Sequence, residues 1–507
     1  MTLLSSESPA VTVREIDLTG NVPAVTSTTG AIVGEFNWGP VNTPVLIGNE
    51  SELASTFGSP LSGDAYAGDF LSASYFLKYS SSAFVVRADR PDILDSDGAI
   101  AHEGYRKSSA GVFEAKYFGK LGDTIKIDTA DASAFSGWAY EGYFTAAPQA
   151  NEVHVIVIQN EVVVETYEFV STIAGSRNPN GTNNFVTDVI NAGSSWITVS
   201  GVPTAGSSTL SGGEDGVAAA VTEYASAFDV FLNKEAIQID FLISPAGGQD
   251  KAQQVHLKLV EIATSRKDCV AVISPTIGDV DAMISYVSTL NSPSSYLIVD
   301  GNWFKVYNKY QDKYEFIPAA SSTAGVMAAA DAVSAPWFSP AGSRRGQYLG
   351  VTELKVNPSK TERDKLYKKG INPIVSIPGQ GVMLFGDKTH QTRPSAFDRI
   401  NVRRLFLVIE RAISKAGENV MFEFNDEFTR AEFVNIVEPF LREIQGRRGI
   451  TDFRVVCDDT NNTAEVVDRN EFIATCFIKP ARSINYVTLN FVAVRSGVEF
   501  EEVVGTV

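Results

Sequence analysis

Residues Ile239–Pro275 read IDFLISPAGGQDKAQQVHLKLVEIATSRKDCVAVISP, and this stretch decides the fold. It opens with a continuous apolar run, 239–245, which is typical of a strand buried on both faces. An amphipathic helical pattern follows over 250–266, and a second apolar strand follows over 268–275. Strand, helix and strand in this order predict two parallel strands joined by a crossover helix.

The same alternation extends on both sides of this stretch. Residues 279–290 are predicted to form a second helix, and residues 294–308 a further strand or hairpin. Upstream, residues 21–90 read as strand, turn and helix and end in a buried strand, AFVVRA. The fold class that we expect is therefore α/β plus α+β, with a mostly parallel sheet covered by helices on both faces.

A different pattern interrupts the alternation between residues 91 and 216. Residues 152–170, EVHVIVIQNEVVVETYEFV, read as a hairpin that turns near Gln159-Asn160. Gly, Ser, Asn and Thr crowd the residues that follow, up to LSGGEDG at 210–216. We expect an inserted β-rich outer domain at 91–216, within an α/β core formed by 21–90 plus 217–390.

The last part of the chain, 391–507, reads as two helices followed by strands and is predicted to be an α+β domain. One apolar stripe marks the first helix: Val402, Leu405, Phe406, Ile409, Ala412, Ile413 and Ala416. A second stripe marks the next helix: Phe433, Val437, Phe440, Leu441 and Ile444. Pro439 is expected to kink or split that second helix, and Gly446 to end it.

Both chain ends read as strands, although termini are usually polar and frayed. Near the start, VTVREIDL lies within an arm that we place at residues 1–20. The end, NYVTLNFVAVRSGVEFEEVVGTV, alternates apolar and polar residues from Asn485 onward, and its terminal arm begins at about 497. The sequence itself offers these end strands no evident partner.

The composition of the 507 residues is that of a soluble globular protein, with 44% hydrophobic and 20% charged residues. The chain has no run of about 18 apolar residues and no basic-then-apolar start, so we expect neither a membrane span nor a secretion signal.

The net charge of −18 disfavours direct binding of nucleic acid. Residues 391–507 contribute little of that charge, since they hold 15 Lys and Arg and 18 Asp and Glu. This asymmetry is compatible with an acidic soluble surface or with a C-terminal part that faces a partner.

No pattern for catalysis or metal binding is present. The three cysteines, Cys269, Cys457 and Cys476, lie far apart and are expected to be small buried apolar residues outside any disulfide framework or zinc site. The four histidines share no short motif. The run PGQGVMLFGDKT lacks the Gly-Lys-Thr of a phosphate loop, because Asp387 precedes Lys388. The run SPAGGQD at 244–250 is compatible with a ligand site or, as we favour, with a glycine turn. We predict no catalytic, cofactor-binding or metal-binding residue, no cofactor and no enzyme activity.

Seven segments carry a resemblance to a known family: SPAVTVREIDLT (8–19), GAIVGEFNWGPVNTPVLIGNESELASTFG (30–58), LSGGEDG (210–216), AASSTAGVMAAADAVSAPWFSPAG (319–342), KKGINPIVSIPGQGVMLFGDKT (368–389), DRINVRRLFLVIERAI (398–413) and KPARSINYVTLNF (479–491). Together they resemble the tail sheath proteins of contractile (myovirus-type) bacteriophage tails. The family often has Trp in place of Phe385 and Arg in place of Lys388. Residues 91–209 match nothing in the family, as expected of an insertion.

This resemblance implies a structural subunit that polymerises into a helical tube of stacked rings around an inner tail tube. Contraction of that sheath drives the tube through the host envelope for genome ejection. The implied partners are further copies of the chain, the inner tail tube protein, and baseplate and tail terminator proteins, with no direct nucleic acid and no membrane insertion. The implied place is the virion tail, after assembly in the bacterial host cytoplasm.

The resemblance also implies that terminal strands are lent to neighbouring subunits by β-strand augmentation. The residues expected in these inter-subunit strands are Val11, Val13, Ile16, Val498, Phe500 and Val503. The residues expected to face the tube are Arg399, Arg403, Arg404, Arg411 and Lys415. The alternative for these basic residues is pairing with acidic residues of the same domain.

Three other functions remain open at this point. The first is the sheath of a phage-derived contractile injection particle. The second is an α/β enzyme with a β-rich insertion. The third is an adhesin or carbohydrate-binding role for the exposed 91–216 insertion.

Overall fold

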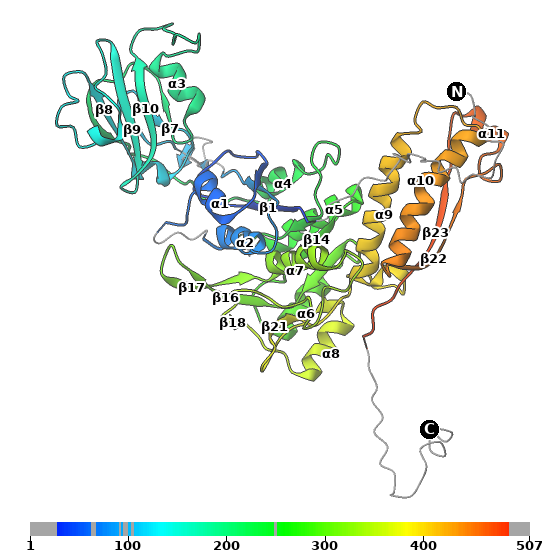
Figure 1. Cartoon of the computed structure of the whole chain (residues 1–507). Coiled ribbons are helices and arrows are strands. Elements are labelled where there is room, and N and C mark those ends of the chain that lie inside the picture. Colours follow the sequence, from blue (N-terminus) through cyan, green and yellow to red (C-terminus); the bar gives the residue numbers. More distant parts are fainter. Residues whose placement is uncertain are drawn as a thin grey trace, which may run out of the picture.

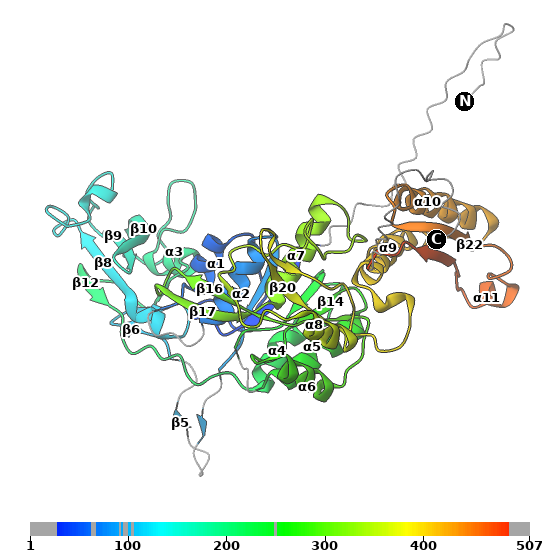
Figure 2. The ribbon, with the colours of Figure 1, turned by 90° about the horizontal axis from the view of Figure 1, so that it is seen from below.

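The structure is a computed structural model that describes residues 28–61, 67–90, 93–94, 100–102, 106–247 and 251–485. It has three lobes (Figure 1): a β-rich lobe, a central α/β body, and a lobe built from α9, α10, β22 and β23. Viewed from below, the β-rich lobe and the α9–α10 lobe lie at opposite ends of the body (Figure 2). The division into domains drawn from the sequence stays a prediction, although these lobes support it.

The body is built on a seven-stranded sheet with the order β19-β15-β14-β13-β1-β3-β2. Its strands are β1 (Gly30–Gly34), β2 (Val45–Ile47), β3 (Ala83–Arg87), β13 (Phe241–Ile243), β14 (Val270–Ile273), β15 (Leu297–Asp300) and β19 (Ile371–Asn372). Every neighbouring pair is parallel except β2 and β3, which are antiparallel. The mostly parallel sheet expected from the sequence is confirmed.

Helices cover both faces of this sheet because its strands are apolar on both sides. Along β1, Ala31 and Val33 face one cluster, whereas Ile32 faces the other. The first face packs against α4 (Val221–Asp229), α5 (Ala252–Arg266), α6 (Val280–Leu290) and α8 (Lys360–Lys368). The second packs against α1 (Glu50–Phe57), α2 (Ala67–Leu77), α7 (Ala320–Val333) and the start of α9.

Two small antiparallel sheets extend the body and enclose a further apolar cluster. One contains β16 (Trp303–Asn308), β17 (Lys313–Pro318) and β18 (Glu353–Leu354). The other is the hairpin of β20 (Ile374–Ile377) and β21 (Gly381–Leu384). The run PGQGVMLFGDKT therefore forms a β-hairpin turn, with positive φ at Gly379 and Gly381, followed by a strand and a loop.

The β-rich lobe has its own apolar core and holds a four-stranded sheet with the order β10-β9-β8-β12. These strands are β8 (Ile125–Asp131), β9 (Glu152–Gln159), β10 (Val162–Ser171) and β12 (Gly206–Thr209). The predicted hairpin is confirmed: β9 and β10 join through Asn160 and Glu161, whose φ angles of 48° and 66° suit a tight hairpin turn. The lobe also holds β6 (Ser109–Ala110), β7 (Phe113–Ala115), η1 (Lys120–Thr124), η2 (Glu141–Tyr143), α3 (Val186–Gly193) and β11 (Ile197–Val199). The short strands β4 (Ile93–Leu94) and β5 (Ile100–His102) pair with each other in a separate sheet, and β5 projects away from the lobe (Figure 2).

The C-terminal lobe follows the predicted order of two helices and then strands. Its elements are η3 (Ala396–Asp398), α9 (Ile400–Glu418), α10 (Glu427–Gly446), β22 (Ile450–Val456), α11 (Ala464–Asp468) and β23 (Thr475–Pro480). The helix α10 ends at Gly446, as expected, but Pro439 does not split it. Val437 and Leu441 on either side of this proline are fully buried, and their packing outweighs the lost hydrogen bond. The third predicted strand, beyond Asn485, lies outside the described residues.

Candidate functional site

The carboxyl edge of the parallel sheet is where α/β proteins commonly bind a ligand. Here the carboxylate of Asp69 fills it, accepting hydrogen bonds from the backbone N–H groups of Ala246 and Gly247 at 2.7 and 2.8 Å. Burial raises the pKa of Asp69 to about 7. A Cβ atom on Gly247 would lie 2.8 Å from this carboxylate. The loop after β13 therefore binds an acidic side chain of the same protein, which favours the glycine-turn interpretation.

Other features of the described chain also point to structure. Within these residues, no group of His, Cys, Asp and Glu side chains is arranged to hold a metal ion, and no helix is long and apolar enough to cross a membrane. Cys269 and Cys457 are buried free thiols, and Cys476 is a half-buried one. The predicted burial is confirmed for Cys269 and Cys457, whereas Cys476 on β23 is only half-buried.

The predicted tube-facing arginines lie on α9, on the side that packs against the α/β body. Arg404 forms a two-pronged ion pair with Asp331 of α7, and these side chains are 4% and 5% exposed. Arg411 binds Asp240, next to β13, with 2.7 Å between Nη1 and Oδ1. Both pairs attach the C-terminal lobe to the body.

The other three basic residues have different surroundings. Arg403 is buried: its guanidinium lies 3.9 Å from the ring centre of Phe397, and it donates to Ser295 at 2.7 Å. Arg399 pairs with Asp387 at 2.9 Å. Lys415 is half-buried and has no ion pair in the described part of the chain. Arg399, Arg404 and Arg411 therefore each bind an acidic residue of the body, and Arg399 also lies 3.8 Å from Asp398 of its own domain. Contact with a tube protein stays a prediction.

An incomplete sheet is the most conspicuous assembly feature of the C-terminal lobe. The strands β22 and β23 pair with each other in antiparallel fashion, and among the described residues neither has a second neighbour. One face of the pair packs on α9 and α10 through Phe453, Val455 and Ile478, whereas Phe477 on the other face is 58% exposed. Each strand thus presents an unpaired edge, which is a template for another strand.

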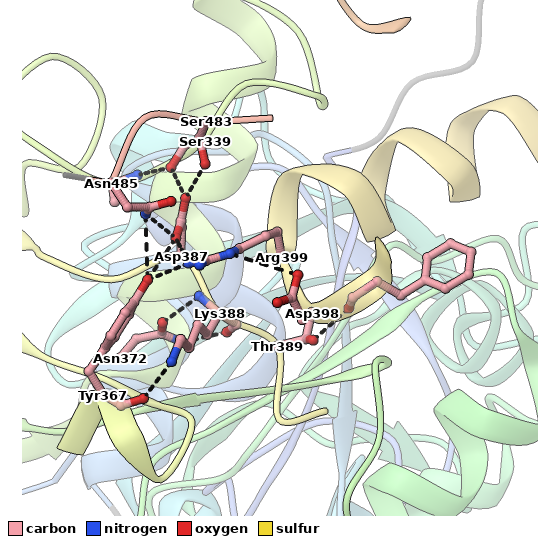
Figure 3. Close-up of polar contacts among 12 residues, drawn as sticks. Ser339, Tyr367, Asn372, Asp387, Lys388, Thr389, Asp398, Arg399, Ser483 and Asn485 are labelled. Atoms are coloured by element: carbon pink, nitrogen blue, oxygen red, sulfur yellow. Dashed lines mark hydrogen bonds and ion pairs between the residues drawn. The ribbon is translucent and has the colours of Figure 1, made fainter. Parts of the chain in front are cut away.

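A second feature, missed by the sequence analysis, is a buried cluster around Asp387, between β21 and α9 (Figure 3). One carboxylate oxygen accepts from Arg399, Tyr367 and Asn485, at 2.9, 3.2 and 3.0 Å. The other accepts from Ser339 and Ser483, at 3.0 and 2.8 Å. Burial by itself would raise the pKa of Asp387, but these donors and the charge of Arg399 hold it below its usual value.

The expected inter-subunit strand residues cannot be placed in the same way. Val11, Val13, Ile16, Val498, Phe500 and Val503 all lie outside the described residues, and so do both terminal arms. Their assignment stays a prediction.

Comparison with known proteins gives three matching regions. Residues 27–88, 215–390 and 392–493 match, in that order, the tail sheath protein Gp18 domain III N-terminal region, the phage tail sheath protein central domain and the phage tail sheath C-terminal domain. The chain is 30% identical to the tail sheath protein of Vibrio phage KVP40, and 100% of both chains is covered. It is 31% identical to that of Salmonella phage ViI, with 98% of both covered, and 30% identical to that of Enterobacteria phage T4, with 100% covered.

Solved structures show the same fold at lower identity. A sheath tail protein from Listeria innocua is 15% identical with a TM-score of 0.59, covering 91% of this chain and 97% of that one. The helical sheath of the anti-feeding prophage in its contracted state is 14% identical, also with a TM-score of 0.59, covering 96% and 99%. With sequence relatives that match along the whole chain, this protein belongs to the family of phage tail sheath proteins, as a structural subunit of a contractile tail.

Proposed function

We propose that this sheath subunit assembles by lending its terminal segments to neighbouring copies, which use them to complete the sheet of β22 and β23. The edges of that sheet, beside which the described part of the chain places no further strand, are the observation that carries the proposal. An isolated two-stranded sheet is marginal in water, and further strands stabilise it. Strand addition supplies main-chain hydrogen bonds for affinity and alternating side chains for register.

The strength of one such link follows from ordinary magnitudes. About five main-chain hydrogen bonds contribute about 1 kcal/mol each, and two or three buried apolar side chains contribute about 2 kcal/mol each. Ordering the lent residues costs about 1–2 kcal/mol per residue. Each link is therefore modest, and a stable sheath requires many of them repeated around a lattice.

In this proposal, the free energy for contraction comes from a second packing of the same subunits rather than from hydrolysis of a nucleotide. The subunit accordingly has a structural and not an enzymatic role. An extra contact of a few hundred Å² per subunit supplies several kcal/mol at about 25 cal/mol per Å². Asp69, which fills the carboxyl edge of the sheet, supports a structural role for the α/β body.

The same proposal assigns positions to the inner tail tube and to the proteins at the ends of the sheath. We place the inner tail tube on the side of the C-terminal lobe and the β-rich lobe outermost, since the two lie at opposite ends of the body (Figure 2). Lys415 is the basic residue best suited to a tube contact, because the arginines of α9 are engaged within the subunit. Baseplate and tail terminator proteins would cap the sheath, which would assemble in the host cytoplasm. A phage tail is favoured over a phage-derived injection particle because the relatives at 30% identity are phage proteins.

Deletion of residues 498–507 tests the proposal. We expect the truncated protein to stay monomeric, whereas the full chain forms rods or tubes in negative-stain micrographs. A matched control replaces the same ten residues with Gly and Ser, which keeps the length but removes the apolar alternation. Long tubes formed by the truncated chain would refute strand lending.

A further inference from the structure

The segment that follows β23 turns away from the C-terminal lobe and returns to the α/β body. Its first residue, Ala481, donates its backbone N–H to the carbonyl of Gly449 at 3.0 Å. Ser483 and Asn485 then reach Asp387, which lies between β21 and α9 (Figure 3). The described residues end at Asn485, at the start of the segment that leads to the predicted terminal arm at about 497.

Apolar burial does little to hold this segment in place. Ile484, its large apolar side chain, is 84% exposed, and Asn485 is also exposed. The two polar residues on either side of Ile484 instead donate to one carboxylate that is itself almost fully buried. Side-chain hydrogen bonds to a buried charge therefore attach the root of the arm.

The acceptor side of this attachment is preorganised by the body. Arg399 at the start of α9, Tyr367 of α8 and Ser339 after α7 all donate to the same carboxylate. Lys388 fixes Tyr367 in turn, since its Nζ donates to the Tyr367 carbonyl at 2.9 Å. Two elements of the body and the start of α9 thus orient Asp387 independently of the arm.

We propose that Asp387 is a clamp that fixes the point and direction in which the C-terminal arm leaves the subunit. The clamp consists of Asp387 with the donors Tyr367 and Ser339 of the body, Arg399 at the start of α9, and Ser483 and Asn485 of the segment that leads to the arm. This inference rests on the proposed lending of the arm to a neighbour. A fixed root confines the arm to a smaller volume and so raises its effective concentration at the sheet of the next subunit.

The test removes the arm donors and leaves the body intact. The variant is Ser483→Ala with Asn485→Ala in the full chain, and the matched control is Ser414→Ala, which removes an exposed hydroxyl of α9 outside the clamp. The first readout is the rate of trypsin cleavage after Arg482 in unassembled subunits, followed by mass spectrometry. Cleavage requires the segment to leave the body, so its rate reports the population of the released state.

We expect cleavage after Arg482 to become about ten- to a hundredfold faster in the double variant, since it loses two hydrogen bonds to a charged group. The control should cleave at the wild-type rate. The second readout is the lowest protein concentration at which tubes form. It should rise about tenfold in the double variant, because a freed arm samples a larger volume.

Two results would overturn the clamp. One is an unchanged cleavage rate in the double variant, which would mean that the bonds do not hold the arm. The other is faster cleavage with an unchanged tube-forming concentration, which would mean that the arm's root is held without consequence for assembly. Neither result would contradict the proposal that terminal strands are lent to neighbouring subunits. That proposal is contradicted only if the protein without residues 498–507 still forms tubes.

Discussion

The buried pair of Arg404 and Asp331 allows a quantitative test of how the C-terminal lobe is attached. In Asp331→Ala, the guanidinium of Arg404 loses the carboxylate of Asp331. The Arg404 side chain is only 4% exposed, so water cannot readily replace that carboxylate. The guanidinium would keep the carbonyl of Met327 at 3.2 Å and the ring of Phe241, 5.0 Å away. Removing one partner of a buried ion pair costs about 3–5 kcal/mol.

The measurement is urea unfolding of unassembled subunits, followed by circular dichroism. We expect Asp331→Ala to lower the free energy of unfolding by about 3–5 kcal/mol. The double variant Asp331→Ala, Arg404→Met removes both charges and should lie within about 2 kcal/mol of the wild type, because no charge is left without a partner. Lys479→Ala, which breaks the exposed pair with Asp452, is the surface control and should have no measurable effect.

The unfolding free energies of these variants decide whether Arg404 of α9 attaches the C-terminal lobe to the body or serves as a surface residue. A loss below about 1 kcal/mol in Asp331→Ala would contradict a buried attachment, since that is the range of surface pairs. It would instead favour an attachment of the C-terminal lobe that does not depend on this ion pair. Equal losses in the single and double variants would show that packing, rather than the orphaned charge, sets the cost.

Three further predictions follow. Burial raises the pKa of Asp300 from 3.8 to about 7, so its stabilising contribution is complete below pH 4 and is lost as the pH rises through 7. Asp300→Asn should therefore reduce the pH dependence of the unfolding free energy between pH 4 and 8. Urea titrations that show the same pH dependence in the variant and the wild type would contradict this. Gly247→Ala should destabilise the body by about 1–3 kcal/mol in thermal unfolding, because the new Cβ meets Asp69 and Tyr224 at 2.8 Å, whereas Gly417→Ala, with open space around it, should not destabilise. Purified sheath should contract without added nucleotide in electron micrographs, and a strict requirement for ATP would refute the stored-energy mechanism.

The α/β body could be predicted from sequence because its strands are buried on both faces. Such strands read as continuous apolar runs, as in β13 and β14, whatever their neighbours are. The helix α10 shows the limit of local rules. Pro439 predicts an interruption by itself, but its ring is exposed, and the buried residues beside it keep the helix continuous.

The polar attachments could not be predicted in this way. Arg411 and Asp240 are 171 residues apart, and Asn485 and Asp387 are 98 apart, so no spacing in the sequence relates them. A row of arginines on a helix reads as an exposed charged face, because arginine is rarely buried without a partner. In the sequence, Asp387 indicates only that the run around it is not a phosphate loop. The residues that donate hydrogen bonds to Asp387 come together only in the folded chain.

The central claim is that neighbouring copies complete the sheet of β22 and β23, and a cryo-EM map of the assembled sheath tests it most directly. We expect the strands beside β22 and β23 to trace back to the terminal segments of other subunits. If those strands instead connect to the same subunit, or if both edges of the sheet stay unpaired in the assembled particle, the claim is wrong.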